Sequence, residues 1–327
     1  MTAASRAGGS GLLRGGCVGG AKRRLALQVR LGTVTGTLPV VPDANRPLAG
    51  VRGLLLDLDG VLILAGRPIP GAVDALTELE RRGVPYRIVT NTSLWSRAAL
   101  ARYGESVGMR VSPDRIWSAL SVSAAYTRRR FEHQPLYVLA SEDARSEFVG
   151  QWLLSNAEAA ARGAHAAAVV VGDSPEEATY GNLNAAFRLL RGGAELIGMH
   201  KNRWWITGDG PTLDSGAFVA GLEFASGRKA VILGKPAAAF FRQAGSELQA
   251  EIAATPTGRI ARHDLAMVGD DLWTDVLAAQ RAGLRGVFVL SGKHGRDDLR
   301  KAAGQKRGGG RPAFVANSLA DVVAELD

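Results

Sequence analysis

The chain has 327 residues, of which 46% are hydrophobic and 22% charged, so it is long enough to bury a sizeable core in about two domains or in one domain with an insertion. The net charge of the chain is +9, and residues 1–50 alone contribute seven basic residues and one acidic residue. The other 277 residues hold 33 bases and 30 acids, a net charge of +3. This near balance argues against a nucleic-acid surface, and the lack of any apolar run near the roughly 20 residues of a membrane span argues against a transmembrane protein.

Residues 1–49 form a basic, low-complexity leader rich in Gly, Ala and Arg. That composition is typical of an organellar transit peptide, and equally of a disordered tail or of upstream sequence added by a misassigned start codon. The one cysteine, Cys17, lies in this leader, so no disulfide can form within one chain and a reducing compartment fits. We therefore expect a cytoplasmic protein, or an organellar one if residues 1–49 are a transit peptide.

From residue 50 onward, short apolar runs alternate with amphipathic stretches, which is typical of strand and helix units around a parallel sheet. The first part of the core, 50–110, is predicted to contain a strand at 51–60, a helix at 68–83, a strand at 84–93 and a helix at 96–108. The ligand site of such a sheet lies beyond the carboxyl ends of its strands.

A middle part, 111–211, shows the same alternation of strands and helices. Its predicted strands are 135–141, 165–173 and 194–200, and its predicted helix, 174–193, starts with Ser-Pro-Glu-Glu. The last part, 212–327, again alternates helices and strands as in 50–110. Its predicted helices are 216–227, 237–249, 272–283 and 318–326, and its predicted strands are 229–236, 264–271 and 284–292. The sequence thus predicts an α/β protein whose parallel-sheet core, 50–110 and 212–327, is split by an inserted α/β domain at 111–211.

Four short polar patterns end or follow predicted strands. Each one alone is more often structural than catalytic, because an Asp-x-Asp pair can be a solvated turn and an acid at a helix start is favoured by the helix dipole. Their occurrence together, in order and all at strand ends, is much harder to explain structurally. They are DLDG with Asp57, Asp59 and Gly60; VTN with Thr90 and Asn91; GKP with Lys235; and GDDLWTD with Asp270, Asp271 and Asp275.

Phosphoryl transfer needs these residue types: a nucleophile in line with the leaving group, a divalent cation and fixed positive charge. Asp57 can attack phosphorus to form an aspartyl phosphate. Asp59, two residues along the strand and on the same side, can protonate the leaving oxygen and later activate water. Asp57 and Asp270 offer hard oxygen ligands for Mg²⁺, and Lys235 and the Thr90 hydroxyl can hold the phosphoryl oxygens.

The motifs DLDGVL, VTNTS, GKP and VGDDLWTD resemble, in this order, the four motifs of the haloacid dehalogenase (HAD) superfamily. The insertion between the second and third motifs, the PIPGA after the first, and GDDxxxDVxxAQxxG followed by SGKHG are similar to its subfamily IIA, which includes pyridoxal phosphatase, bacterial nucleotidases and the phospholysine phosphohistidine inorganic pyrophosphate phosphatase. The resemblance covers the chain from about Gly50 onward. It implies a modified Rossmann core, an inserted α/β cap over the active site, Mg²⁺ dependence, phosphatase activity and often a homodimer formed through the cap.

The resemblance also implies roles for individual residues. Asp57 corresponds to the nucleophile, Asp59 to the general acid/base, whose backbone carbonyl also binds the metal, and Asp270 to a direct metal ligand. Thr90 corresponds to the phosphate-binding hydroxyl, with Asn91 beside it, and Lys235 to the charge-stabilising lysine. Asp275, with Asp271 assisting, corresponds to a carboxylate behind the metal ligands. An aspartate at position 59 favours a phosphatase over a dehalogenase, because dehalogenases proper lack it.

Two departures concern the substrate. Nucleotidase-like members have Thr-Asn-Asn at the second motif where this chain has Thr-Asn-Thr, and a Thr-Asn-x-Asp stretch where it has HKNRWWITGDG at 200–210. Both features resemble the phospholysine phosphohistidine inorganic pyrophosphate phosphatase side of the branch. A small phosphorylated metabolite, or a P–N or P–O–P bond, is the expected substrate.

Several other residues have a structural and a functional interpretation. Trp204 and Trp205 are expected to pack in the hinge or the cap sheet rather than to form a wall of the pocket. His200 and Lys201 suit a solvated strand end as well as a contact with an anionic substrate, and Lys293 and His294 are expected in a surface loop. Candidates for substrate specificity on the 174–193 helix are Tyr180, Asn182 and Asn184.

Two other functions remain open at this point. A phosphotransferase or mutase would pass the phosphoryl group from Asp57 to another acceptor. A ligand-binding protein of the same fold would have lost turnover, although it would then have no chemical need for all four motifs.

Overall fold

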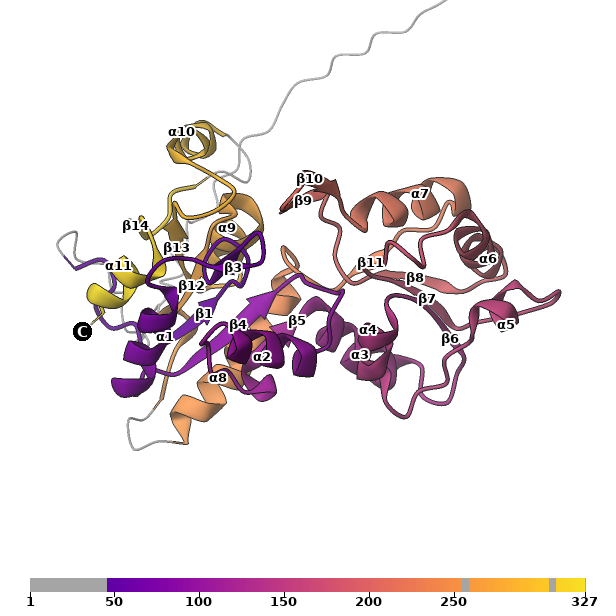
Figure 1. Ribbon diagram of the computed structural model, residues 1–327, viewed down its shortest axis with the longest axis horizontal. Coiled ribbons are helices and arrows are strands. Elements are labelled where there is room, and N and C mark those ends of the chain that lie inside the picture. The colour runs from indigo at the N-terminus through magenta and orange to yellow at the C-terminus, as the bar shows by residue number, and fades with distance from the viewer. Residues whose placement is uncertain (1–45, 255–258, 306–309, 327) are drawn as a thin grey trace, which may run out of the picture. The chain divides into compact units, whose positions relative to one another are not determined.

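The computed structural model describes residues 46–254, 259–305 and 310–326 (Figure 1). Cys17 and most of the predicted leader, 1–49, lie outside the described residues. Across these described segments, no helix has both the length and the apolar character needed to cross a bilayer.

The larger of the two main sheets has six parallel strands in the order β14-β13-β12-β1-β4-β5. Strand β1 is central, with β4 on one side and β12, which comes some 200 residues later in the chain, on the other. Loops that leave the carboxyl ends of such neighbours diverge and create a crevice. The strands are β1 Gly53–Leu56, β4 Tyr86–Thr90, β5 Ile116–Ser118, β12 Leu265–Gly269, β13 Arg285–Val289 and β14 Phe314–Ala316.

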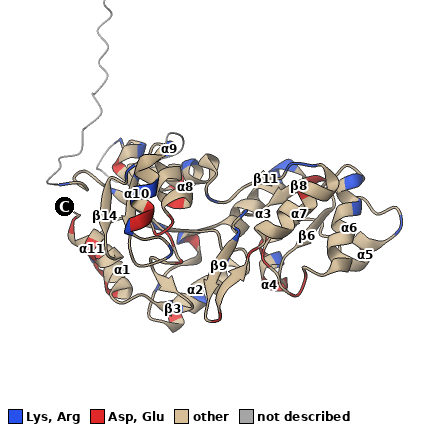
Figure 2. Cartoon of the chain, turned by 90° about the horizontal axis from the view of Figure 1, so that it is seen from above, with Lys and Arg blue, Asp and Glu red and all other residues tan. Residues whose placement is uncertain are grey.

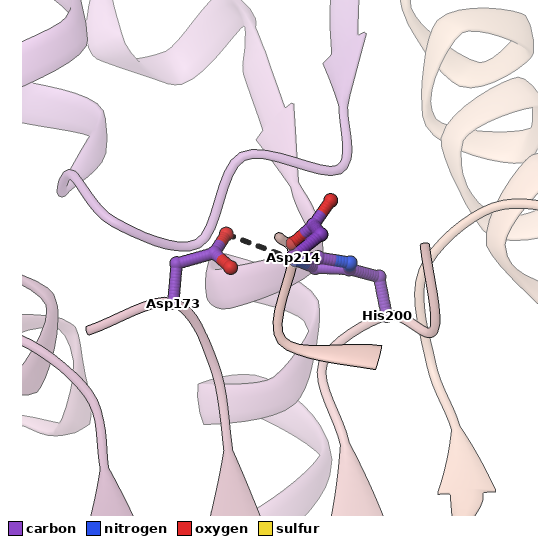
Figure 3. Close-up of side chains that lie close together, drawn as sticks. All are labelled: Asp173, His200 and Asp214. Carbon is purple, nitrogen blue, oxygen red and sulfur yellow. Dashed lines mark hydrogen bonds and ion pairs between the residues drawn. The ribbon is translucent and has the colours of Figure 1, made fainter. Parts of the chain in front are cut away.

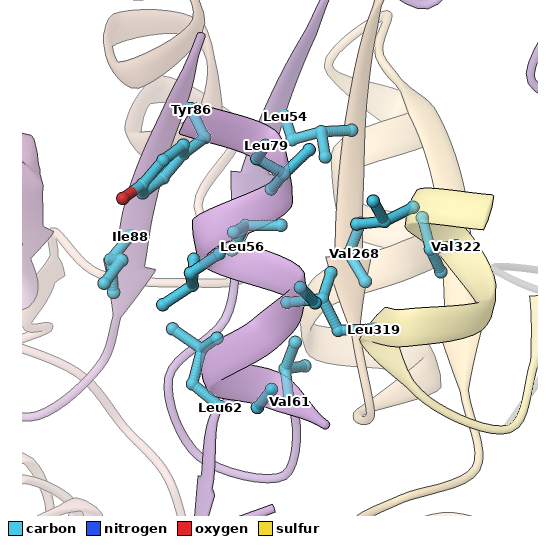
Figure 4. Packing of buried hydrophobic residues seen from close by; sticks show 14 of the residues in the cluster. Leu54, Leu56, Val61, Leu62, Leu79, Tyr86, Ile88, Val268, Leu319 and Val322 are labelled. Atoms are coloured by element: carbon cyan, nitrogen blue, oxygen red, sulfur yellow. The ribbon is translucent and has the colours of Figure 1, made fainter. Parts of the chain in front are cut away.

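Both faces of this sheet are covered, so its strands are apolar on both sides. Leu54 and Leu56 of β1 pack in one cluster with helices α1 (Ala72–Arg81), α2 (Arg97–Ser106) and α11 (Leu319–Ala324). Figure 4 shows the contributions of α1 and α11 to this cluster. Leu55 points to the other face, against α8 (Ala238–Ala253) and α9 (Leu277–Arg281). All three leucines are fully buried, each worth about 1.5–3 kcal/mol over an exposed position, and this anchors the strand that carries Asp57.

The second main sheet has four parallel strands in the order β11-β8-β7-β6. Its strands are β6 Leu136–Leu139, β7 Ala168–Val171, β8 Glu195–Gly198 and β11 Val231–Ile232. One face packs on α3 (Ala119–Arg130) and α4 (Glu142–Arg145). The other face packs on α5 (Asn156–Ala160), α6 (Tyr180–Arg191) and α7 (Gly216–Ser226).

The chain passes from one sheet to the other at residues that differ from 111 and 211, the predicted boundaries of the inserted domain. Strand β5 belongs to the six-stranded sheet, whereas α7 and β11, beyond residue 211, pack with the four-stranded one. The short β5 and β11 carry too little periodic pattern to reveal which sheet they join. The division into core and cap domains itself stays a prediction.

Helix α6 begins at Tyr180, so the predicted start at 174 was wrong. The Ser174 hydroxyl accepts the backbone N–H of Glu177 and closes a turn, whereas Thr179 caps the helix by accepting from Asn182 N–H. Both segments have N-cap chemistry, and only the second continues as a helix. Elements that the sequence did not predict include β2 Ile63–Leu64, β3 Arg67–Pro68, β9 Trp204–Thr207, β10 Gly210–Leu213, α10 Arg296–Gly304 and the single turns Pro113–Arg115, Ser146–Phe148 and Arg262–Asp264.

The loop after β4 joins the two sheets through polar contacts. The Arg97 guanidinium forms a bidentate ion pair with the Glu147 carboxylate, with N–O distances of 3.1–3.2 Å. The backbone N–H and the hydroxyl of Ser96 both donate to the carboxylate of Asp143, at 2.6 and 3.0 Å. In Figure 2, acidic and basic segments are spread over helices around both sheets, for example on α10 and α6.

Candidate active site

Three adjacent strands of the six-stranded sheet end in polar residues. Asp57 follows β1, Thr90 is the last residue of β4 and Asp270 follows β12. Parallel strands in register bring these ends together, and the Asp57 N–H extends the ladder to Val268 O at 2.9 Å. One cavity of about 350 Å³ is lined by all eight residues that the sequence selected: Asp57, Asp59, Thr90, Asn91, Lys235, Asp270, Asp271 and Asp275.

A buried lysine joins two buried carboxylates at the centre of this cavity. The ammonium of Lys235 lies 2.6 Å from Asp57 Oδ1 and 2.9 Å from Asp275 Oδ1, and it also donates to Val89 O at 3.3 Å. Burial lowers the pKa of Lys235, but the charges of Asp275 and Asp57 outweigh that effect and raise it. Lys235 therefore stays positively charged in the folded protein.

Asp57, Asp270 and Asp275 form a cluster whose ligand oxygens all lie within 4.8 Å of one another. Burial, opposed by Lys235 and reinforced by Asp270, raises the pKa of Asp57 to about 6. Burial and the charge of Asp275 raise the pKa of Asp270 to about 7. Apart from its 2.9 Å ion pair with Lys235, the buried Asp275 Oδ1 has no hydrogen-bond partner. One lysine does not balance three carboxylates, so this set of hard oxygen donors fits a divalent cation.

Close packing fixes the position of the Asp270 carboxylate. A Cβ at Gly60 or at Gly292 would lie 2.0 Å from Asp270 Oδ2, so only glycine fits at either position. The backbone N–H of Lys293 donates to the same oxygen at 2.6 Å. Gly60 also has φ +81°, a conformation that glycine adopts freely.

A turn of π-helix, Leu272–Val276, follows Asp270 and directs Asp275 back toward Lys235. Its N-cap is Asp271, whose Oδ1 accepts the N–H groups of Trp273 and Thr274 at 3.1 and 2.9 Å. Single π turns are frequent at functional sites. Asp271 thus shapes the turn, and it pairs with the Lys293 ammonium at 3.1 Å.

A chain of hydroxyl groups leads from Thr90 to Asp59. Thr90 Oγ1 donates to Thr92 Oγ1 at 3.0 Å, and Thr92 Oγ1 donates to Asp59 Oδ2 at 3.4 Å. Thr92 is a site residue that the sequence analysis noted only as a departure from the nucleotidase pattern. Asp59 is solvent-exposed in the cavity, unlike Asp57.

The side-chain amide of Asn91 holds the backbone of Lys235 from both sides. Asn91 Oδ1 accepts the Lys235 N–H at 2.8 Å, and Nδ2 donates to Lys235 O at 2.9 Å and to Asn202 Oδ1 at 3.1 Å. Asn91 thereby connects the second motif to the third and to the loop after β8.

The expectation that Trp204 and Trp205 pack in the hinge or the cap sheet was wrong. Strand β9 pairs only with β10 among the described strands, both indoles are about 40% exposed, and both line the cavity with Asp57. The Lys293 ammonium lies 4.8 Å from the ring centroid of Trp204, so Lys293 belongs to this cavity and not to a remote surface loop. A hairpin outside both main sheets has no pattern in sequence that distinguishes it from a buried strand.

The structure also shows the surroundings of the other residues for which the sequence allowed both a structural and a functional interpretation. His200 is 1% exposed, so a solvated strand end was wrong for it, whereas Lys201 pairs with Glu223 near the surface. The α6 candidates Tyr180, Asn182 and Asn184 do not line the cavity with Asp57. His294 accepts the backbone N–H of Leu272 at 3.1 Å and so supports the π turn.

A second titratable cluster, which the sequence analysis did not assemble, lies where the two sheets meet (Figure 3). His200 Nε2 lies 3.0 Å from Asp173 Oδ2 and 3.7 Å from Asp214 Oδ1. Ser93, in the loop after β4, donates its hydroxyl to Asp173 and accepts the Asp173 N–H, both at 2.9 Å. The segments after β7 and after β8 thus meet at one serine of the VTNTS motif, and Asp214, before α7, joins them through His200.

Comparisons with known proteins agree with this geometry. A family model described as haloacid dehalogenase-like hydrolase matches residues 54–151, and one described as HAD-hydrolase-like matches 232–322. The chain is 34% identical over 252 residues to the mouse (Mus musculus) haloacid dehalogenase-like hydrolase domain-containing protein 2, covering 77% of this chain and 88% of that one. It is also 34% identical over 255 residues to the human (Homo sapiens) phospholysine phosphohistidine inorganic pyrophosphate phosphatase, covering 76% and 86%.

Among solved structures, the p-nitrophenyl phosphatase from Archaeoglobus fulgidus superposes with a TM-score of 0.72 at 27% identity, over 84% of this chain and 99% of that one.

Proposed function

The chain belongs to the haloacid dehalogenase-like hydrolases and is a phosphatase, and from that premise we propose that it hydrolyses a small phosphorylated metabolite, or a P–N or P–O–P bond, through a phosphoryl group carried on Asp57. The observation that supports this most directly is the buried contact of Lys235 with Asp57 and Asp275 beside Asp270. A nucleophile, a fixed cation and a metal-type donor set within one cavity are what phosphoryl transfer requires. The name of the human relative motivates the inclusion of P–N and P–O–P bonds.

Mg²⁺ is the cofactor in this proposal. The carboxylates of Asp57 and Asp270 would hold it with the backbone carbonyl of Asp59, and Asp275, with Asp271 behind the turn, would support the site. When bound, the ion neutralises the charge that develops on the phosphoryl oxygens. The raised pKa values of Asp57 and Asp270 fit this assignment, because burial, together with repulsion between the carboxylates, disfavours their charged forms and a bound cation would offset both effects.

The two aspartates of the first motif divide the chemistry. A carboxylate oxygen of Asp57 attacks phosphorus, and the bond from phosphorus to the leaving atom breaks while Asp59 delivers a proton to that atom. Asp59, now ionised, takes a proton from water as the water oxygen attacks phosphorus, and the bond to Asp57 breaks to release phosphate. The Thr92 hydroxyl orients Asp59 for both proton transfers.

The positive charge and the hydroxyl of the next two motifs act on the phosphoryl oxygens. Lys235 neutralises Asp57 before attack and the phosphoryl oxygens afterwards, and Thr90 lines the same cavity. Asn91 lines the cavity as the predicted phosphate-binding residue, and its two hydrogen bonds to Lys235 give it a positioning role.

The four-stranded sheet and its helices serve as a cap in this proposal, because closure over the cavity would exclude water from the attack step. A homodimer formed through the cap and a cytoplasmic location complete the proposal. The organellar alternative depends on residues 1–49. Neither a phosphotransferase nor a non-catalytic binding role is favoured by any contact described above.

The test compares Asp57→Asn with the wild type and with Asp114→Asn, which changes an exposed acid that does not line the cavity. Asp57→Asn should abolish Mg²⁺-dependent phosphate release from 4-nitrophenyl phosphate, because an amide oxygen is a poor nucleophile, and the circular dichroism spectrum should stay unchanged. Mass spectrometry of acid-quenched wild-type enzyme should find one phosphoryl group on the peptide that contains Asp57. Phosphate release by Asp57→Asn at the wild-type rate would overturn the proposal.

A further inference from the structure

The cavity that contains Asp57 continues into a second one of about 470 Å³, which we call the distal cavity. Its walls include Trp95, Tyr103, Asp173, Trp205, Asp214 and Phe218. The two cavities share Asp59, Asn91, Asn202 and Trp205. Asp59 is the proposed proton donor to the leaving group, so a leaving group that receives this proton extends toward the distal cavity.

The two cavities differ in charge. Lys235 and Lys293 line the reaction cavity, where the phosphoryl group would bind. Among the described residues that line the distal cavity, none is Lys or Arg, whereas Asp59, Asp173 and Asp214 all contribute carboxylates. A leaving group with a second phosphate or a carboxylate would face these acids without a counter-charge.

His200 is the one basic side chain of the distal cavity within the described residues, and its Nε2 is engaged by Asp173 and two serine hydroxyls. It is 1% exposed, and Nε2 contacts Asp173 at 3.0 Å (Figure 3). Nε2 also lies 3.2 Å from the hydroxyl of Ser93 and 3.2 Å from that of Ser215. Its Nδ1 accepts the Asn202 N–H at 3.4 Å, so the neutral ring carries its proton on Nε2. That tautomer presents a donor to the two carboxylates, which favours a hydrogen-bonded cluster over a metal ligand.

Asp173 is the carboxylate of the cluster that a ligand can reach, because its side chain is 23% exposed, whereas that of Asp214 is 4% exposed. Burial alone would raise the pKa of Asp173, but its hydrogen bonds with His200 and Ser93 lower it, so Asp173 stays ionised. Burial and Asp173, opposed by His200, raise the pKa of Asp214 to about 7. Ser93 and the Ser215 N–H, which donates to Asp173 Oδ1 at 3.2 Å, hold the Asp173 carboxylate in place.

Aromatic faces complete the distal cavity. The rings of Trp95 and Tyr103 lie 5.9 Å apart, and the Tyr103 hydroxyl is fixed by a hydrogen bond to Gly66 O at 2.9 Å. Trp95 and Trp205 are 40% and 43% exposed. Aromatic faces beside a fixed carboxylate are the chemistry that binds organic cations.

Resting on the proposed phosphatase function, we propose that the distal cavity selects a positively charged leaving group, so that the preferred substrates are monophosphates whose alcohol or amine part carries a protonated or quaternary nitrogen. Asp173 is the specificity-determining anion, and Trp95 and Trp205 supply cation–π contacts. A volume of about 470 Å³ suits a leaving group of small-metabolite size.

The test measures one ratio: kcat/KM for phosphate release from phosphocholine divided by kcat/KM for 3,3-dimethylbutyl phosphate, its uncharged isostere. The ratio does not depend on the fraction of active enzyme. For the wild type it should be about tenfold, since a partly desolvated cation–π and carboxylate contact is worth one to two kcal/mol. Asp173→Asn should lower the ratio to about two or less, because the amide keeps the shape and loses the charge.

Two further variants separate selectivity from structural damage. Asp143→Asn removes a carboxylate that also joins the two sheets but lies outside the distal cavity, and its ratio should equal that of the wild type. Trp95→Leu should lower the ratio severalfold without touching the cluster. Inhibition of 4-nitrophenyl phosphate hydrolysis by choline, compared with 3,3-dimethylbutanol, should show the same preference.

The outcomes are distinguishable. A wild-type ratio of one or less, or a high ratio that neither Asp173→Asn nor Trp95→Leu lowers, would overturn this inference and leave the proposed phosphatase chemistry in place. No phosphate release from any ester, 4-nitrophenyl phosphate included, would overturn the proposed function and this inference with it.

Discussion

Replacing Lys235 with methionine tests whether one ammonium group balances the carboxylates of the active site. Lys235 is 3% exposed, and its ammonium lies within 2.9 Å of both Asp57 and Asp275. Methionine fills most of the same volume and removes the charge. The two carboxylates would then be buried without that cation, and the pKa of each is raised even with it.

Removing one partner of a buried ion pair costs about 3–5 kcal/mol of unfolding free energy, and we expect Lys235→Met to lose this amount at pH 8 in EDTA. At pH 5 the loss of unfolding free energy should be smaller than at pH 8. The pKa of Asp57 in the folded wild type is about 6, above its value of 3.8 in the unfolded chain, and loss of Lys235 moves it higher. A carboxyl whose folded-state pKa is raised stabilises the fold below pH 4 and loses that contribution as the pH rises through the folded-state value.

Urea unfolding followed by tryptophan fluorescence, at pH 5 and at pH 8, gives both free energies. The matched control is Lys201→Met, which breaks the ion pair with Glu223, where the side chains are 37% and 13% exposed, and should cost about 1 kcal/mol or less. The reasoning is refuted if Lys235→Met destabilises no more than Lys201→Met at pH 8, or if its loss is the same at both pH values.

Three further predictions use other parts of the site. Gly60→Ala should lower stability by at least about 1–2 kcal/mol in urea unfolding and reduce phosphate release, because φ is +81° and the new methyl would lie 2.0 Å from Asp270 Oδ2; wild-type values for both would contradict this. Mg²⁺ should raise the melting temperature more at pH 8 than at pH 5.5, because protons on Asp57 and Asp270, with pKa values of about 6 and 7, compete with it; an equal rise at both pH values would count against these carboxylates as ligands. Asp214→Asn should flatten the fall in melting temperature between pH 5 and pH 8, because the raised pKa of Asp214 makes the fold lose stability as the pH rises through about 7; a variant as steep as the wild type would refute the role of Asp214.

The sequence by itself determined the α/β class and the reaction cavity. Apolar runs that end in Asp57, Thr90 and Asp270 predicted strands, and parallel strands bring their carboxyl ends to one edge, so these side chains had to meet. Lys235 lies at the same cavity, as its motif predicted. This much was predictable because strand periodicity and the polar residue that follows a strand are local properties of the chain.

Only the tertiary structure decided which residues line the two cavities. Asp173 and His200 lie 80 and 107 positions after Ser93 in the chain, yet both side chains contact it. The β9–β10 hairpin likewise brings Trp204 to Lys293. No local pattern records such contacts, because they depend on how the loops of two separately wound sheets approach each other. The cluster of polar residues around Asp57 was therefore predictable from the sequence, whereas the charge and shape of the distal cavity follow only from the way the two sheets come together.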